Sequence, residues 1–298
     1  MKYVYYSGCS LKSSGKAYEE SLLAVFGRLH FPIEELRDWN CCGATSYMAI
    51  DEKKAFTLAA RNLALAEQQV GNGETNLIAP CSACYMVLTK AQHSIRIYPE
   101  IGDSVREELE ACGITYHDTT KIRHPLDVLV NDIGLEKISH EVKTPLKGLN
   151  VASYYGCQVV RPFVQFDDPR MPVTMDRIVQ ALGANPIDWP LKTRCCGGSL
   201  TNTITEVGLR LNHHLLQDAE RRKADIMITA CPLCQFNLEC YRRDIADLYE
   251  KKFYYPVLYF TQLMGMAFGI PEKELGLHRT LIPPTCVRKI TEGKEVYA

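Results

Sequence analysis

The chain has 298 residues, and its 34 lysines and arginines nearly balance its 35 aspartates and glutamates, which gives a net charge of −1. This length is consistent with two domains that each bury a core, and a near-neutral chain without a basic stripe argues against nucleic-acid binding. No signal peptide precedes the first predicted strand, and no apolar run is long enough to span a membrane, so we expect a cytoplasmic protein.

Strands and helices are predicted to alternate through the first 135 residues. Ser13 or Ser14 is expected to cap a helix that ends before Pro32. Four large side chains should line its buried face: Tyr18, Leu22, Leu23 and Phe26. The other predicted strands lie at 2–8, 33–39, 76–79 and 114–117, and the other predicted helices at 48–70, from Cys84 onward, after residue 99 and at 125–130.

The second half repeats this order after a linker that we place at 136–148. The predicted strands lie at 149–155, 186–189 and 225–230, and the predicted helices at 173–182, 204–222, from Pro232 onward and, as a core helix, at 256–270. The helix at 204–222 is expected to bury four side chains: Ile204, Val207, Leu211 and Leu215. We therefore predict a first domain at 1–135 and a second at 149–298.

Cysteines carry the clearest repeat in the chain. Ten of the 13 cysteines form two matching sets, whose equivalent members lie 148 to 154 residues apart. The first set is Cys9, Cys41, Cys42, Cys81 and Cys84, and the second is Cys157, Cys195, Cys196, Cys231 and Cys234. Internal repetition of this kind predicts two copies of one structural unit.

Each cysteine position follows a predicted strand and precedes a helix. Alternating strands and helices predict an α/β fold with a parallel sheet in each half. The loops at the carboxyl ends of parallel strands meet at one edge, so each set of five cysteines should converge there. Several of these cysteines should lie at helix N-termini, where thiolates are favoured.

Without a secretion signal, so many cysteines are more often metal ligands or catalytic groups than disulfides. Zinc remains an alternative because Cys-x-x-Cys is a zinc-site pattern, although a fifth cysteine and adjacent cysteines fit one tetrahedral ion poorly. Iron–sulfur clusters are the alternative with thiolate ligands, but the ferredoxin run is absent. Disulfides and redox-active dithiols remain weaker alternatives. Cys112, Cys240 and Cys286 lie outside both sets and are expected to be small buried hydrophobic residues.

The spacing and order of these ten cysteines resemble the paired cysteine-rich CCG domains of the heterodisulfide reductase B-subunit family. The resemblance covers nearly the whole chain, including the Cys41-Cys42-Gly43 and Cys195-Cys196-Gly197 motifs. It implies two pseudo-symmetric domains, each with a non-cubane [4Fe-4S] cluster bound by its five cysteines. It further implies reductive cleavage of a disulfide such as that of coenzyme M and coenzyme B between the two clusters.

The chain has no nucleotide-binding or flavin motif, so its electrons are expected to come from, or go to, another protein. The resemblance implies which proteins these are: a ferredoxin-like C subunit and a flavin-containing A subunit. Three other functions stay open. One is a sulfur-oxidising subunit that acts on a lipoate- or protein-bound sulfur substrate. Another is an electron-transfer subunit without a small substrate; a zinc-stabilised scaffold is a third, non-redox alternative.

Several polar residues near the cysteines are weaker candidates for the site. Three cationic residues could hold an anionic substrate group: Arg161, Lys192 and Arg194. The alternative is that they are solvated surface cations that bind no substrate. His213 or His214 could donate a proton to a leaving thiolate, although a helix-surface or core histidine is the alternative. Gln235 and Asn237 could donate hydrogen bonds to cluster sulfurs.

Overall fold

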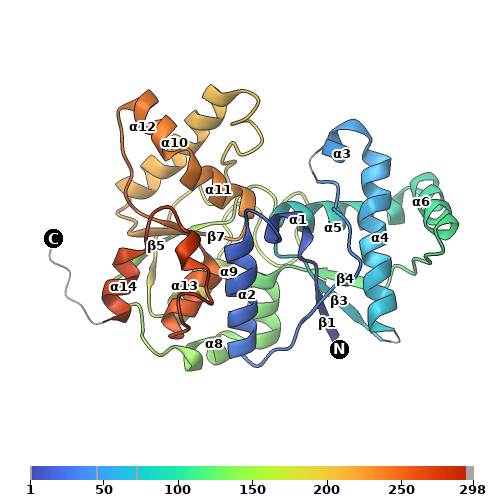
Figure 1. The fold of residues 1–298 in the computed structure, drawn as a ribbon, viewed down its shortest axis with the longest axis horizontal. Coiled ribbons are helices and arrows are strands. Elements are labelled where there is room, and N and C mark those ends of the chain that lie inside the picture. Colours follow the sequence, from blue (N-terminus) through green and yellow to red (C-terminus); the bar gives the residue numbers. More distant parts are fainter. Residues whose placement is uncertain (1, 45, 72, 293–298) are drawn as a thin grey trace.

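The computed structural model describes residues 2–44, 46–71 and 73–292. Met1 and Asn72, which the sequence places in a strand and at a helix end, lie outside the described residues. The described chain forms two four-stranded sheets, and every strand pair in both of them is parallel. The predicted α/β class with two pseudo-symmetric parallel sheets is therefore confirmed (Figure 1).

The first sheet has the strand order β2-β1-β3-β4. Its strands are β1 (Lys2–Tyr5), β2 (Glu34–Glu35), β3 (Thr75–Ile78) and β4 (Thr120–Arg123). Its helices are α1 (Gly8–Leu11), α2 (Lys16–Arg28), α3 (Ser46–Ile50), α4 (Glu52–Val70), α5 (Ser82–Ile97), α6 (Pro99–Ala111) and α7 (Pro125–Asp127), which continues into a π-helical turn at Val128–Ile133.

The second sheet has the equivalent order β6-β5-β7-β8. Its strands are β5 (Asn150–Tyr154), β6 (Asn185–Pro186), β7 (Ile226–Thr229) and β8 (Val257–Tyr259). Its helices are α9 (Thr174–Ala181), α10 (Thr205–Arg221), α11 (Pro232–Cys240), α12 (Arg242–Tyr249), α13 (Phe260–Ala267) and α14 (Thr285–Thr291), with a 3-10 turn at Leu277–Arg279.

Three predicted elements were wrong in place or kind. The last strand of the first sheet is β4 rather than 114–117. The predicted helix at 48–70 is two helices, because the Asp51 carboxylate accepts a hydrogen bond from the Lys54 amide at 3.1 Å and caps α4. The apolar run at 256–270 contains β8 as well as α13, since such a run is compatible with either a buried strand or a buried helix.

The predicted helix faces and caps also need correction. Leu23 and Ile204 are exposed, while Tyr18, Leu22 and Phe26 are buried as predicted. Neither Ser13 nor Ser14 caps α2, whose N-cap is Gly15. The Ser13 hydroxyl instead donates to the carbonyl of Cys9 at 2.8 Å, so this serine braces the loop that carries the first cysteine.

The two halves pack directly on one another, and one hydrophobic core extends through both. Helix α2 from the first half lies beside α13 from the second, and the hydroxyls of Ser21 and Thr261 are 2.6 Å apart across this contact (Figure 1). The stretch predicted as a linker contains most of α8 (Leu135–Glu141) and buries Ile138 and Leu146. The connection between the halves is thus part of the core.

Candidate functional site

The first set of cysteines gathers at the carboxyl edge of the first sheet. Cys9 lies in α1 directly after β1, and Cys41 and Cys42 lie in the loop after β2. Cys81 is the N-cap residue of α5 after β3, and Cys84 lies in the first turn of this helix. The strand order therefore brings together residues that are up to 75 positions apart in the sequence.

The second set repeats this placement at the second sheet. Cys157 follows β5, Cys195 and Cys196 lie in the loop between β6 and α10, Cys231 is the N-cap residue of α11 and Cys234 lies in its first turn. The expectation that each set converges on one sheet edge agrees with this geometry.

Matching hydrogen bonds hold the two Cys-Cys-Gly loops. The Tyr6 hydroxyl donates to the carbonyl of Asn40 at 2.7 Å, and the Tyr154 hydroxyl donates to that of Arg194 at 2.6 Å. Gly43 and Gly197 both have φ of +81°, a conformation that glycine adopts without the steric cost of a side chain. The resemblance between the halves thus extends from the cysteines to the groups that orient them.

Within each set the sulfurs are close without being bonded. The Sγ atoms of Cys42 and Cys84 are 3.1 Å apart, and those of Cys196 and Cys234 are 3.5 Å apart. A disulfide is near 2.05 Å, so both pairs are thiols. In the first set Cys9 and Cys41 are exposed and the other three are buried, so this set opens to solvent on one side. Cys157 and Cys195 are the more exposed members of the second set.

Proton sharing among these thiols favours thiolates at defined positions. A hydrogen bond from Cys157 lowers the pKa of Cys195 to about 6 despite partial burial. A hydrogen bond from Cys41, followed by one from Cys84, holds the pKa of Cys42 well below its ordinary value. Because the thiolate is the form that binds metal, each Cys-Cys pair contributes a sulfur prepared for ligation.

Two features of the surroundings fit a group larger than the thiols themselves. A Cβ added at Gly156 would lie 3.1 Å from the Sγ of Cys234, and one added at Gly8 would lie 2.9 Å from the Tyr6 ring and 3.4 Å from the Sγ of Cys84. The buried hydroxyls of Tyr18 and Tyr259 have no hydrogen-bond partner among the described residues. Sulfide ions of a cluster would provide acceptors in such a space, so the residues present fit an iron–sulfur cluster in each half.

The two tyrosines had no signal in the sequence, because neither is adjacent to a cysteine. Burial raises the pKa of each hydroxyl well above its ordinary value, and the Cys81 and Cys231 thiols add to the effect on both. Each tyrosine therefore keeps its proton and can serve as a hydrogen-bond donor.

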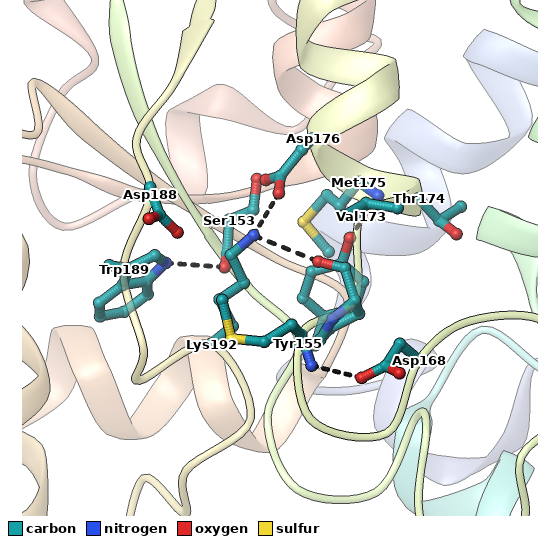
Figure 2. A network of polar contacts seen from close by, with 12 residues as sticks. Ser153, Tyr155, Asp168, Val173, Thr174, Met175, Asp176, Asp188, Trp189 and Lys192 are labelled. Atoms are coloured by element: carbon teal, nitrogen blue, oxygen red, sulfur yellow. Dashed lines mark hydrogen bonds and ion pairs between the residues drawn. The ribbon is translucent and has the colours of Figure 1, made fainter.

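Two of the predicted cationic residues are held by the protein itself. Lys192 is buried and forms an ion pair with Asp176 of α9, and its ammonium also donates to the carbonyl of Pro172 at 3.2 Å (Figure 2). The guanidinium of Arg161 donates to the carbonyl of Thr193. The ammonium of Lys192 is thus already paired with a carboxylate, and its role toward an anionic substrate stays a prediction.

Arg194 and His214 lie beside the second set of cysteines. Both line a surface groove with Cys195, and the apolar wall of this groove is formed by Leu191, Leu211 and Leu215. The groove thus combines a cation and an imidazole with a thiol of the set. His213, by contrast, is buried and stacks on Tyr249 with 4.1 Å between ring centroids, so it does not share this groove.

Gln235 and Asn237 both form hydrogen bonds with protein groups near the second set. The Asn237 amide donates to the carbonyl of Cys196 at 2.6 Å and accepts from the Thr201 hydroxyl at 2.6 Å. The Gln235 amide donates to Glu239 at 3.0 Å. Both amides are thus engaged with protein groups, and their hydrogen bonds to cluster sulfurs stay a prediction.

The three cysteines outside the sets differ from expectation. Cys112 and Cys240 are exposed, so their prediction as buried residues was wrong, and Cys286 is partly buried. Among the described residues no group of three or more His, Cys, Asp or Glu is arranged to hold a single metal ion. None of the described helices is both long and apolar enough to cross a membrane.

Comparison with known proteins agrees with the two-fold repeat. The family model described as "CCG: Cysteine-rich domain" matches residues 3–89 and 151–239. A chain from Wolinella succinogenes named "8-methylmenaquinol:fumarate reductase membrane anchor subunit" is 31% identical over 95% of this chain and 98% of its own length.

Other relatives carry heterodisulfide reductase names. A protein of Archaeoglobus profundus, named as similar to the B subunit of heterodisulfide reductase, is 30% identical over 93% of this chain and 94% of its own length. The B subunit of the ferredoxin:CoB-CoM heterodisulfide reductase of Methanosarcina mazei is 27% identical over 92% of both chains. A solved structure titled as a hypothetical protein from Helicobacter pylori shares the fold, with a TM-score of 0.75 at 18% identity over 95% of this chain and 52% of that one.

Proposed function

Because the chain belongs to the cysteine-rich CCG domain family and matches heterodisulfide reductase B subunits along nearly its whole length, we propose that it is the iron–sulfur subunit of a heterodisulfide reductase-type complex. The observation that carries the proposal is the convergence of five cysteines at the carboxyl edge of each sheet. Five thiolates including an adjacent pair suit a cluster of several irons, bound once in each half.

We assign the ligands by set, each to a [4Fe-4S] cluster of the non-cubane type. The first cluster is bound by Cys9, Cys41, Cys42, Cys81 and Cys84, and the second by Cys157, Cys195, Cys196, Cys231 and Cys234. When bound, the clusters supply the electrons that cleave a disulfide. Two electrons and two protons convert the disulfide to two thiols, and the electrons come from a ferredoxin-like or flavin-containing partner subunit.

The chain's own residues would admit and orient the substrate. The more exposed cysteines of each set mark the side from which a disulfide can approach. In the groove at Cys195, the Arg194 guanidinium suits an anionic substituent and His214 suits delivery of a proton to a leaving thiolate.

A second function is favoured by one specific observation. The relative from Wolinella succinogenes that is 31% identical along nearly its full length carries a fumarate reductase name, not a disulfide one. An electron-transfer subunit with the same clusters and no small substrate is therefore the alternative. A sulfur-oxidising subunit would use the same site in the reverse direction.

Metal analysis of protein purified without oxygen tests the clusters. We expect about eight irons and a similar amount of acid-labile sulfide per chain, four for each cluster, with little zinc. Cys81→Ser and Cys231→Ser should each lose about half of the iron, while Cys112→Ser, at an exposed cysteine outside the sets, should keep all of it. Zinc in place of iron would reduce the protein to a scaffold and would end the redox proposal.

Addition of a disulfide or thiol separates the two redox functions. In a disulfide-cleaving subunit, a small anionic disulfide should change the electron paramagnetic resonance spectrum of the oxidised protein. Arg194→Gln should weaken this response, and Arg210→Gln, an exposed cation on α10 outside the groove, should not. If the iron content is full and no disulfide changes the electron paramagnetic resonance spectrum, the electron-transfer function is favoured.

A further inference from the structure

Tyr18 and Tyr259 form a closed aromatic pair between the two halves. Tyr18 comes from α2 of the first half and Tyr259 from the end of β8 in the second. Their rings are stacked with 4.6 Å between centroids and 5° between planes, and the two side chains are 0% and 1% exposed. Phe260 packs edge-on against Tyr18 and completes the enclosure.

The hydroxyls of this pair have no hydrogen-bond partner among the described residues. Burying a hydroxyl without a partner destabilises a folded protein, because the group loses its hydrogen bonds to water and gains none in return. Tyr6 and Tyr154, the other tyrosines near the cysteines, both donate to backbone carbonyls. The stacked pair is thus an unfavourable arrangement unless its donors meet an acceptor that the polypeptide does not supply.

The pair lies where the two cysteine sets come together. Tyr259 pairs in the sheet with Thr229, two residues before Cys231, and Gly15, the N-cap residue of the helix that carries Tyr18, lies against Pro232, directly after Cys231. The Ser82 hydroxyl, adjacent to Cys81, donates to the carbonyl of Ala230, adjacent to Cys231, at 3.2 Å. The N-termini of α5 and α11, where the buried Cys81 and Cys231 lie, therefore meet here.

We propose that the Tyr18 and Tyr259 hydroxyls donate hydrogen bonds to sulfur atoms of the two clusters, Tyr18 to the cluster of Cys81 and Tyr259 to the cluster of Cys231. This inference rests on the proposed function, since it requires both clusters. Hydrogen bonds to cluster sulfurs offset negative charge and are one of the means by which a protein sets a cluster's reduction potential. The two tyrosines are positioning residues that tune both clusters from their shared buried side.

The pair also gives the clusters a common boundary. Both rings are buried, whereas Cys9 and Cys41 are exposed, so a disulfide would reach the first set from the side of those two cysteines.

Phenylalanine variants test the proposal, because they keep the stacked rings and remove only the hydroxyls. We expect Tyr18→Phe and Tyr259→Phe to keep the iron content of wild-type protein while their clusters shift to lower reduction potential, with the larger shift in the double variant. Tyr255→Phe is the matched control, since its buried hydroxyl donates to the carbonyl of Leu216 at 2.8 Å and no cysteine acts on it. The reduction potentials of both clusters in Tyr255→Phe should equal those in the wild-type protein.

The melting temperature of the cluster-free protein gives a second readout, in which Tyr18→Phe and Tyr255→Phe should differ in direction. Without clusters the hydroxyls are unsatisfied, so Tyr18→Phe should leave the melting temperature unchanged or raise it, whereas Tyr255→Phe should lower it. With clusters bound, Tyr18→Phe should speed cluster loss. Electron–nuclear double resonance of wild-type protein, before and after exchange into D2O, detects the hydroxyl protons near each cluster even if a variant fails to fold.

The outcomes separate the inference from the function on which it rests. Full iron content in all variants with unchanged potentials and no exchangeable proton signal overturns the tyrosine proposal alone. Wild-type protein without iron overturns both. If the clusters of Tyr255→Phe also have lower reduction potentials, the shift comes from general loosening of the fold, and the tyrosine proposal is overturned as well.

Discussion

At the scale of single residues, the site depends on where a side chain is missing as much as on the cysteines. Gly156 has φ of +73°, and a Cβ there would lie 3.1 Å from the Sγ of Cys234. Gly8 has the equivalent place in the first half, with φ of +60°. In both halves the residue before the first cysteine of the set leaves room for the last cysteine of the set.

Gly156→Ala should therefore damage the second cluster specifically. The added methyl group adopts a disfavoured backbone conformation, at about 1–2 kcal/mol, and also pushes against the Cys234 sulfur. We expect the iron content to fall toward half of the wild-type value. Gly113→Ala is the matched control, because Gly113 also has φ of +73° but nothing within 4 Å of its added Cβ. It should lose a similar amount of stability and keep its iron, so equal iron loss in both would contradict this account.

At the scale of elements, one buried ion pair joins α9 to the loop after β6. Asp176 lies in the first turn of α9, and its partner Lys192 comes from the loop that leads to Cys195 (Figure 2). The side chains are 13% and 4% exposed. The backbone around this lysine is also engaged, since its carbonyl accepts hydrogen bonds from the amides of Tyr155 and Gly156. The ion pair and these hydrogen bonds thus fix the positions of the Cys157 and Cys195 loops relative to one another.

Lys192→Met should cost about 3–5 kcal/mol of unfolding free energy at neutral pH, because it leaves a buried carboxylate without its partner. Burial already raises the pKa of Asp176, against the lowering effect of Lys192. In the variant the penalty is absent below the ordinary aspartate pKa and grows as pH rises through the raised folded value. Urea unfolding should therefore show a smaller difference from wild type in mildly acidic than in mildly alkaline buffer.

An exposed ion pair gives the control for this measurement. Lys251 pairs with Glu220 at 2.7 Å with both side chains partly exposed, so Lys251→Met should cost less than about 1 kcal/mol. A Lys192→Met variant as stable as this control at every pH would mean that the buried pair contributes nothing to the fold.

The elements also show which parts of the structure the sequence could predict. The cysteine repeat predicted two parallel sheets and two converging sets, because strand–cysteine–helix order determines which loops share an edge. It did not predict β4, because Thr120 is held by a distant group, the Glu67 carboxylate, which accepts hydrogen bonds from the amides of Thr119 at 2.7 Å and Thr120 at 3.2 Å. The sequence did not predict Tyr18 and Tyr259 as site residues for the same reason, because their contact depends on packing between the halves.

At the scale of the whole molecule, the two halves share more than a sequence pattern. Tyr18 and Ser21 of α2 contact Phe260 and Thr261 of α13, and Val25 of α2 is fully buried in the core cluster that both halves share. The backbone amides of Lys143 and Thr144, in the connection between the halves, both donate to the carbonyl of Ala267 at the end of α13. One core cluster therefore spans both halves and includes the buried cysteines of the first set, while the buried cysteines of the second set lie in a further cluster within the second half.

This shared core predicts a single cooperative unfolding transition for both halves. The chain has two tryptophans, Trp39 in the first half and Trp189 in the second, so Trp39→Phe and Trp189→Phe each leave one reporter. The fluorescence transitions of the two variants in urea should coincide after correction for any difference in stability. Val25→Ala, which removes buried methyl groups from the core cluster that both halves share, should lower the unfolding free energy by about 2 kcal/mol in both variants. If Trp39 and Trp189 report transitions that separate, or if Val25→Ala shifts one of them alone, the halves fold independently, and the tyrosine pair between them would be held by domain docking instead of by the core.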